Sequence, residues 1–167
     1  MTYLTETLQS FHEKEKFSSG NELLDMYLHT QANQDIKRKL SVCFVMKESE
    51  NNLVKGYYTL SNNSIPLHII PESIQKKLPQ SYKSIPTILL GRLAIDAKFQ
   101  GQGLGQLLLI DALKRCHEIS RSIGSFAVIV DPTDQKAEFF YKKYGFVKLP
   151  DSGKMFLSMK TINQLFQ

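Results

Sequence analysis

Three glycines alternate with polar or leucine residues where an apolar run ends and a leucine-rich segment begins, in the stretch QGQGLGQ at residues 100–106. The first backbone amides of a helix have no partner within the helix, and the helix dipole places partial positive charge on them. Glycine has no Cβ, so an anion can approach such amides closely. The stretch therefore predicts a site for a phosphate or pyrophosphate. A tight turn that requires positive φ is the structural alternative.

The spacing of the glycines excludes two common nucleotide motifs. A P-loop requires lysine and then serine or threonine after its last glycine, whereas Gly105 is followed by Gln106 and Leu107. The dinucleotide fingerprint G-x-G-x-x-G requires its third glycine one residue later than Gly105. Neither nucleotide motif fits.

Apolar periodicity predicts the elements that position this turn. We expect a helix within residues 18–40, a hairpin of strands at 41–48 and 52–65, and a short helix between loops at 65–86. A strand at 87–95 then leads into the turn and a helix at 104–119 follows it; further on come a strand at 125–130, a helix at 133–146 and a strand at 154–162. This order predicts an α/β fold with helices on both sides of a sheet.

Composition predicts one ordinary globular domain spanning 1–167, with 42% hydrophobic and 22% charged residues. No segment approaches the roughly 18 apolar residues of a membrane span, and the first 17 residues lack a signal-peptide pattern. We therefore expect a cytoplasmic protein with no membrane partner. The net charge is +5, and residues 56–167 hold fourteen Lys/Arg against eight Asp/Glu, which suits an anionic ligand or nucleic acid.

Cysteine and histidine usage predicts no metal site. Cys43 and Cys116 lie in apolar surroundings, as expected of buried, reduced thiols, and a nucleophilic role for Cys116 is disfavoured by its mid-helix position. The four histidines lack the spacing of zinc ligands.

Two segments together resemble the GNAT N-acetyltransferases. Residues 100–105 match the family signature Q/R-x-x-G-x-G/A, and FYKKYGF at 140–146 matches an F-Y-x-x-x-G-F segment that follows the fifth strand. The resemblance covers the chain from about residue 18 onward. It implies a single-domain GNAT fold with a central mixed sheet that splays at the cofactor cleft, and acetyl-CoA as cosubstrate.

The resemblance also implies roles for individual residues. The backbone of Leu93, Ala94 and Ile95 would pair with the pantetheine arm, and Phe140 would flank the thioester. The pyrophosphate would be held by the amides around Gln100, Gly101, Gln102, Gly103, Leu104, Gly105 and Gln106.

Tyr141 is the candidate general acid, because a phenol with a pKa of about 10 is protonated at neutral pH and can return a proton to the CoA thiolate. Packing at the seam of helix and sheet is the structural alternative for Tyr141, and Tyr144 is a nearby competitor for the role.

The strand at 87–95 departs from the family pattern because it holds no carboxylate before Asp96, where many GNAT enzymes place a glutamate base. A lysine acceptor would arrive protonated and require a base, whereas an α-amine has a pKa of about 7.7–8.0. This favours an α-amine acceptor, although a carboxylate from elsewhere remains an alternative: Glu22, Glu48, Asp131 or Asp134.

Three basic residues are candidates for binding the acceptor. Arg92 interrupts an apolar strand, where a charge is costly unless it is paired or near solvent. It predicts either an acceptor contact or a salt bridge with Asp96 or with a residue of the hairpin. Lys37 and Arg38 are candidates for an RNA-facing surface, with solvated charge as the alternative.

Several segments resemble the GNAT subgroup that includes toxins of toxin–antitoxin pairs, which acetylate the α-amino group of aminoacyl-tRNA. They are GNELLDMYL, GYYTLSNNSI, SIPTILLGRLAID and the F-Y segment. The likeness implies aminoacyl-tRNA as acceptor, an antitoxin as partner and a homodimer. The alternatives are an enzyme that acetylates a small-molecule or protein amine, and a non-catalytic acyl-CoA-binding module.

Overall fold

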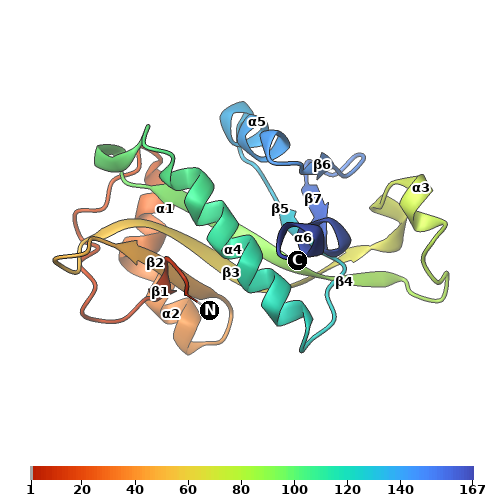
Figure 1. Ribbon diagram of the computed structural model, residues 1–167, viewed down its shortest axis with the longest axis horizontal. Helices are drawn as coiled ribbons and strands as arrows, with labels where there is room; N and C mark the ends of the chain where they lie inside the picture. Colours follow the sequence, from red (N-terminus) through yellow and green to blue (C-terminus); the bar gives the residue numbers. More distant parts are fainter. Residues whose placement is uncertain (1) are drawn as a thin grey trace. The chain divides into compact units, whose positions relative to one another are not determined.

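The computed structural model describes residues 2–167, which form one seven-stranded mixed sheet with accompanying helices (Figure 1). The strand order in the sheet is β1-β2-β3-β4-β5-β7-β6. The strands are β1 (Glu6–Thr7), β2 (Val42–Lys47), β3 (Val54–Pro66), β4 (Ser84–Ile95), β5 (Ala127–Val130), β6 (Val147–Lys148) and β7 (Met155–Ser158). The predicted α/β class is confirmed.

The helical elements lie between these strands, except for one helix after β7 that falls where the sequence predicts the end of a strand. They are α1 (Glu22–Met26), a π-helical turn η1 (Tyr27–Gln31), α2 (Ala32–Lys37), a 3₁₀ turn η2 (Leu67–Ile69), α3 (Glu72–Gln75), a 3₁₀ turn η3 (Ala97–Phe99), α4 (Leu104–Ser120), α5 (Gln135–Lys143) and α6 (Met159–Leu165). No helix within residues 2–167 combines the length and apolar character needed to cross a bilayer.

The chain divides into two compact units. The N-terminal unit comprises residues 1–61 and 90–113, and the C-terminal unit comprises residues 62–89 and 114–167. The boundaries fall within β3, between the two halves of β4 and within α4, so each of these elements contributes to both units.

The N-terminal unit is built on the antiparallel hairpin of β2 and β3, which pair from Val42 with Leu60 to Lys47 with Val54. Side chains alternate between the faces of a strand. Tyr57 therefore packs into the core that α1, η1 and α2 cover, while the hydroxyl of Tyr58 donates to Asp111 Oδ2 of α4 at 2.8 Å. Helices thus cover both faces of the sheet in this unit, as the sequence predicts.

The C-terminal unit surrounds β5, which is parallel to β4 and antiparallel to β7. Every residue of β5 is buried, as expected of a central strand. Its core also includes Ile65, Ile85, Leu149 and Phe156. The predicted helix at 133–146 is α5, which Asp134 caps by accepting a hydrogen bond from the amide of Ala137 at 2.8 Å.

The predicted last strand, 154–162, is correct only as far as Ser158. The hydroxyl of Ser158 accepts from the amide of Thr161 at 3.2 Å and starts α6. Ile162 is fully buried on the inner face of that helix. A serine cap placed in the middle of an apolar run therefore replaces the second half of the strand by a helix.

Candidate active site

The glycine turn leads directly into α4, whose first residue is Leu104. Gly101 and Gly103 have φ angles of +80° and +78°, and a Cβ at either position would meet no atom within 4 Å. Within residues 2–167, the backbone amides of residues 102–106 have no hydrogen-bond acceptor, and the first helical bond runs from Leu107 N to Gly103 O. The turn thus presents open, unpaired amides at a helix N-terminus, the geometry that suits a phosphate.

The side chain of Gln100 has a structural role that the sequence does not reveal. Its Nε2 donates to Ser19 O and to Ile95 O, each at 2.8 Å. The side chain therefore ties the end of β4 to the loop before α1.

Asp96 braces the same turn. Its carboxylate accepts from the amides of Ser18 at 3.1 Å and Lys98 at 2.9 Å, and the residue is 6% exposed. Both oxygens are thus occupied by backbone donors. The structure therefore assigns Asp96 a capping role and does not pair it with Arg92, contrary to the salt-bridge alternative.

Residues 93–95 form the end of β4 that the sequence assigns to the cofactor. On one edge Asp96 N donates to Lys55 O of β3 at 2.8 Å. Gly56 permits this close approach, since a Cβ there would lie 3.0 Å from Ala94 O. On the other edge, the recorded pairs with β5 end at Leu89 with Ile129, and β5 itself ends at Val130. Residues 93–95 thus lie beyond the segment of β4 that pairs with β5.

Arg92 is half-buried and lies over an aromatic ring. Its guanidinium carbon is 3.5 Å from the centre of the Tyr27 ring. The Tyr27 hydroxyl donates to Asp35 Oδ2 at 2.8 Å, and both of these residues are buried. Sequence reasoning missed Tyr27 and Asp35, because Tyr27 falls within the apolar stripe of its helix and reads as core.

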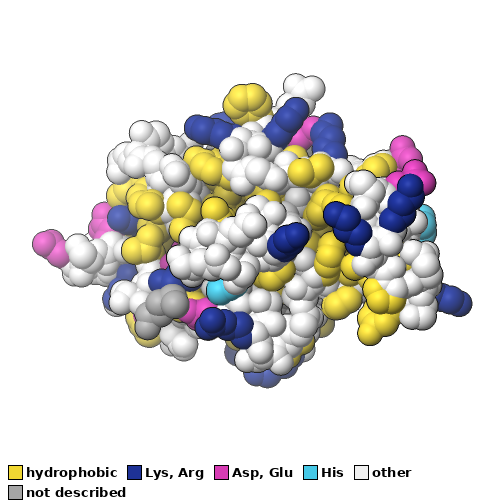
Figure 2. Space-filling view, turned by 45° about the vertical axis from the view of Figure 1, so that its right-hand side comes forward, with side chains coloured by type: hydrophobic (Ala, Val, Ile, Leu, Met, Phe, Trp, Pro, Cys, Tyr) yellow, Lys and Arg dark blue, Asp and Glu magenta, His cyan; other side chains and the backbone are white. Residues whose placement is uncertain are grey.

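Lys37 and Arg38 are exposed at the C-terminal end of α2, the helix that carries Asp35. Lys and Arg side chains appear at several separate places on the face shown in Figure 2. The excess positive charge is therefore not gathered into one patch on that face.

Tyr141 lies on α5, in the C-terminal unit, and is 7% exposed. Its ring meets Phe140 and Phe146 edge-on, each with centroids 5.3 Å apart. Within residues 2–167 its hydroxyl has no hydrogen-bond partner, and burial raises the pKa of Tyr141. A buried phenol that stays protonated and has no protein partner is suited to donate to a ligand.

Of the four alternative carboxylates, three have local partners. Glu48 accepts from Asn51 Nδ2 at 2.9 Å, Asp131 pairs with Lys154 at 3.2 Å, and Asp134 caps α5. Glu22 is exposed in the first turn of α1. None of these four residues belongs to β4, the strand that leads into the glycine turn.

The two thiols are buried and unreactive in character. Burial raises the pKa of both Cys43 and Cys116 to about 12, so neither supplies a thiolate at neutral pH. Among residues 2–167 no three His, Cys, Asp or Glu side chains gather as a metal site would require.

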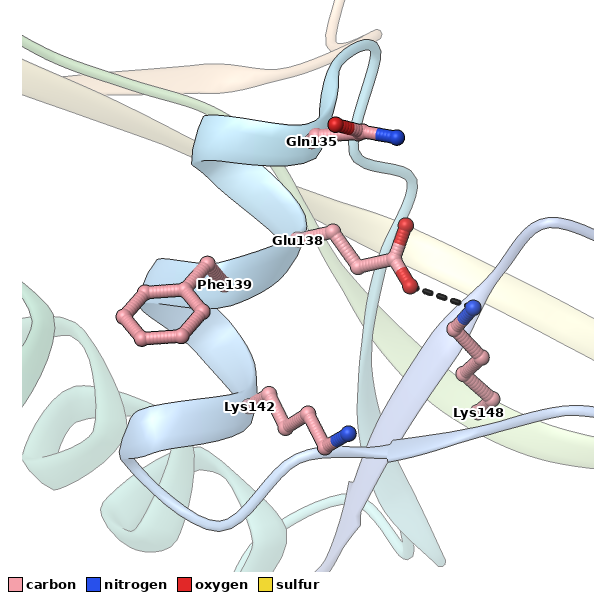
Figure 3. Close-up of a pocket in the computed structure, with 5 residues that line it drawn as sticks. All are labelled: Gln135, Glu138, Phe139, Lys142 and Lys148. Atoms are coloured by element: carbon pink, nitrogen blue, oxygen red, sulfur yellow. Dashed lines mark ion pairs between the residues drawn. The ribbon is translucent and has the colours of Figure 1, made fainter.

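A pocket in the C-terminal unit lies between α5 and β6 (Figure 3). It is lined by Gln135, Glu138, Phe139, Lys142 and Lys148. An ion pair between Glu138 and Lys148 ties the strand to the helix. Glu138, the carboxylate in this lining, is thus already paired with a lysine.

Comparison with known proteins agrees with this geometry. Residues 82–156 match the model of an acetyltransferase (GNAT) domain. The chain is 37% identical to a tRNA-acetylating toxin of Mycobacterium tuberculosis over 89% of this chain and 87% of the relative. It is 29% identical to a probable toxin TacT of Sinorhizobium fredii over 92% of this chain and 89% of the relative.

Two solved structures extend the likeness to the fold. A tyrosine-to-phenylalanine variant of KacT has a TM-score of 0.91 and 28% identity, covering 97% of this chain and 98% of that one. AtaT complexed with acetyl-methionyl-tRNAfMet has a TM-score of 0.89 and 32% identity, covering 98% of both chains. The chain belongs to the GNAT acetyltransferase family and is similar within it to the tRNA-acetylating toxins.

Proposed function

We propose that this protein is an acetyl-CoA-dependent N-acetyltransferase that acts on the α-amino group of aminoacyl-tRNA. The glycine turn carries the proposal, because its unpaired amides stand open at the start of α4. Two solved relatives hold the acetyl donor and the acetylated product of such a reaction: AtaTR is bound with acetyl-CoA, and AtaT is complexed with acetyl-methionyl-tRNAfMet. We infer that both units act as one catalytic domain spanning 1–167.

Acetyl-CoA supplies an activated acetyl thioester, and this chain's residues bind and orient it. The amides of residues 102–106 hold the pyrophosphate, whereas the amide of Gln100 already donates to Ala97 O at 3.4 Å. The backbone of Leu93 to Ile95 pairs with the pantetheine arm, and Phe140 lies beside the thioester. A glycine at 101 and 103 leaves room for the phosphates, since no side chain projects from either position.

Tyr141 donates its proton to sulfur as the C–S bond breaks and the bond between nitrogen and the acetyl carbon forms. The attacking amine loses one proton to water, and the Tyr141 phenolate takes up one proton from water, so the phenol is restored and the products are the amide and the free CoA thiol. The raised pKa of Tyr141 keeps its proton in place until the sulfur leaves. Direct attack in a ternary complex requires no thiol nucleophile, consistent with two buried cysteines.

The choice of an α-amine as acceptor rests on the lack of a general base on the strand before the glycine turn. With Asp96 committed to two amides, the strand that leads into the turn offers no carboxylate to deprotonate a lysine. An α-amine with a pKa of about 7.7–8.0 is partly neutral at pH 7.5 and can attack unaided. Arg92, Lys37 and Arg38 supply positive charge for the RNA.

The same relatives indicate a biological setting. AtaT is known in complex with the C-terminus of the antitoxin AtaR, and the KacTA complex binds DNA. We infer that this chain acts as a toxin in the cytoplasm, pairs with itself as a homodimer and is neutralised by an antitoxin.

Transfer of labelled acetyl groups from acetyl-CoA to a pool of charged tRNA tests the proposal. The wild type labels the tRNA fraction, Tyr141→Phe does so at least 100-fold more slowly, and Tyr82→Phe, an exposed control, retains full activity. Loss of activity in Tyr144→Phe instead of Tyr141→Phe would transfer the acid role to Tyr144. Labelling of proteins or small amines alone would favour the other GNAT substrates, and acetyl-CoA binding without any transfer would favour a binding module.

A further inference from the structure

The guanidinium of Arg92 is held in place without an acceptor. Its carbon lies 3.5 Å from the centre of the Tyr27 ring, and within residues 2–167 its N–H groups have no recorded hydrogen bond or ion pair. A guanidinium has five N–H donors in one plane, and Arg92 is only half-buried, so these donors can be reached from solvent. A ring contact on the face of the group leaves these in-plane donors available to a ligand.

Tyr27 is itself fixed from two directions. Its hydroxyl donates to Asp35 Oδ2 at 2.8 Å, and its ring stacks on Tyr57 with centroids 6.3 Å apart and an interplanar angle of 16°. Tyr57 in turn donates to Leu24 O at 2.6 Å. Burial, reinforced by the bond to Asp35, raises the pKa of Tyr27 to about 12, so its hydroxyl remains a donor throughout the neutral range.

The position of Tyr27 in the fold connects it with the other basic residues. Tyr27 begins the π-helical turn between α1 and α2, and such turns occur often at functional sites. The helix that follows carries Asp35 and ends at Lys37 and Arg38, both exposed. The element that fixes the ring thus also carries the two further cations assigned to the acceptor.

We propose that Tyr27, held by Asp35, is a positioning residue that aims the Arg92 guanidinium at a phosphate of the acceptor RNA. The inference rests on the proposed function and names the contact by which that acceptor is held. An aminoacyl ester has no free carboxylate, so the phosphodiester is the anion it offers. Arginine binds phosphate through paired N–H donors, and a stacked guanidinium loses less freedom when it does so.

A double-mutant cycle on the binding of deacylated tRNA tests this inference. We expect Arg92→Met to weaken binding roughly tenfold and to reduce the salt dependence by about one ion. Tyr27→Leu weakens binding about fivefold in the wild-type background, because the guanidinium is no longer aimed. In the Arg92→Met background the same change has no further effect, since its partner is gone.

Two further variants separate positioning from folding. Tyr27→Phe keeps the ring and loses the Asp35 bond, so its affinity falls between those of the wild type and Tyr27→Leu. Tyr82→Leu removes an exposed tyrosine, 55% accessible, and leaves affinity unchanged. If thermal melts show that Tyr27→Leu does not fold, the cycle is run with Tyr27→Phe and Arg92→Met, and the same non-additivity is expected.

The inference is overturned if Tyr27 substitutions weaken binding equally with and without Arg92, or if the wild type binds no tRNA. Its failure is distinguishable from that of the proposed function. Additive effects in an enzyme that acetylates charged tRNA overturn the positioning role alone. Non-additive effects in a protein that binds tRNA but transfers no acetyl group overturn the proposed activity and support the positioning role.

Discussion

The phenol of Tyr141 has the most direct part in the proposed chemistry. Tyr141→Phe preserves the edge-on packing against Phe140 and Phe146 and removes only the hydroxyl. We expect kcat to fall by about 10²–10⁴ while KM for acetyl-CoA stays within about twofold. Steady-state kinetics measure both constants, and an unchanged kcat would remove Tyr141 from the mechanism.

The pH profile follows from the direction of the Tyr141 pKa. Burial raises that pKa above the usual value of 10, so the acid stays protonated through pH 10. We expect kcat/KM to rise as the α-amine loses its proton near pH 8 and to show no decline below pH 10. A decline centred near pH 9 would mean that another group is the acid.

Gln100 supports the site through its side chain. Gln100→Ala removes the bonds to Ser19 O and Ile95 O, so we expect a loss of about 1–2 kcal/mol in the free energy of unfolding and a higher KM for acetyl-CoA. Gln100→Glu places a carboxylate, which cannot donate, against both carbonyls. It should therefore lower the free energy of unfolding more than Gln100→Ala does. Equal behaviour of wild type and both variants in urea unfolding and kinetics would show that the tether is dispensable.

At the scale of elements, alanine substitutions at two glycines distinguish the cost of backbone strain from the loss of a ligand contact in the glycine turn. Gly103→Ala and Gly153→Ala place a Cβ at similar φ angles, +78° and +70°, in open space. Each should lower stability by about 1–2 kcal/mol. Only Gly103→Ala should also weaken acetyl-CoA binding, by about tenfold or more in calorimetry. A matching loss of affinity in Gly153→Ala would contradict the assignment of the turn to the cofactor.

The helices and strands predicted from the sequence are correct where the apolar pattern is long. They are wrong or missing where an element is very short or where a capping residue sets its end. The helix expected at 104–119 is α4, because an apolar stripe of Leu104, Leu108, Ala112 and Cys116 continues along one of its faces. The strands β1 and β6 have two residues each, too few to show a period, and neither was predicted. Ser158 ends β7 and starts α6 through a single hydrogen bond, which the apolar pattern cannot reveal.

Within the candidate site, contiguous motifs can be predicted from the sequence, whereas contacts between distant residues cannot. The glycine turn and the F-Y segment are visible in the sequence because their residues are contiguous. The Tyr27–Asp35–Arg92 cluster joins residues up to 65 positions apart, and no local pattern marks it. The engagement of Asp96 by two amides likewise appears only in three dimensions.

The whole molecule should lose stability in alkali, because its thiols titrate more readily when unfolded. Burial raises the pKa of Cys43 and Cys116 from 9.0 to about 12. Their contribution to stability is complete below pH 9 and is lost as pH rises toward 12. At pH 10 we expect a loss of about 3 kcal/mol for the two thiols together.

Urea unfolding at pH 7.5 and pH 10 measures this loss. The Cys43→Ala/Cys116→Ala variant should lose much less stability between these two values, because its remaining buried phenols titrate later. A wild type equally stable at both values would contradict the burial of the thiols.

The central claim is that the acetyl group reaches the α-amine of aminoacyl-tRNA. Its most direct measurement is mass spectrometry of aminoacyl-adenosine released by nuclease from charged tRNA after reaction with deuterated acetyl-CoA. The account predicts a deuterated acetyl group on the α-nitrogen, formed by the wild type and lost in Tyr141→Phe. Unmodified aminoacyl-adenosine from every charged tRNA, in the presence of an enzyme that binds acetyl-CoA, would contradict it.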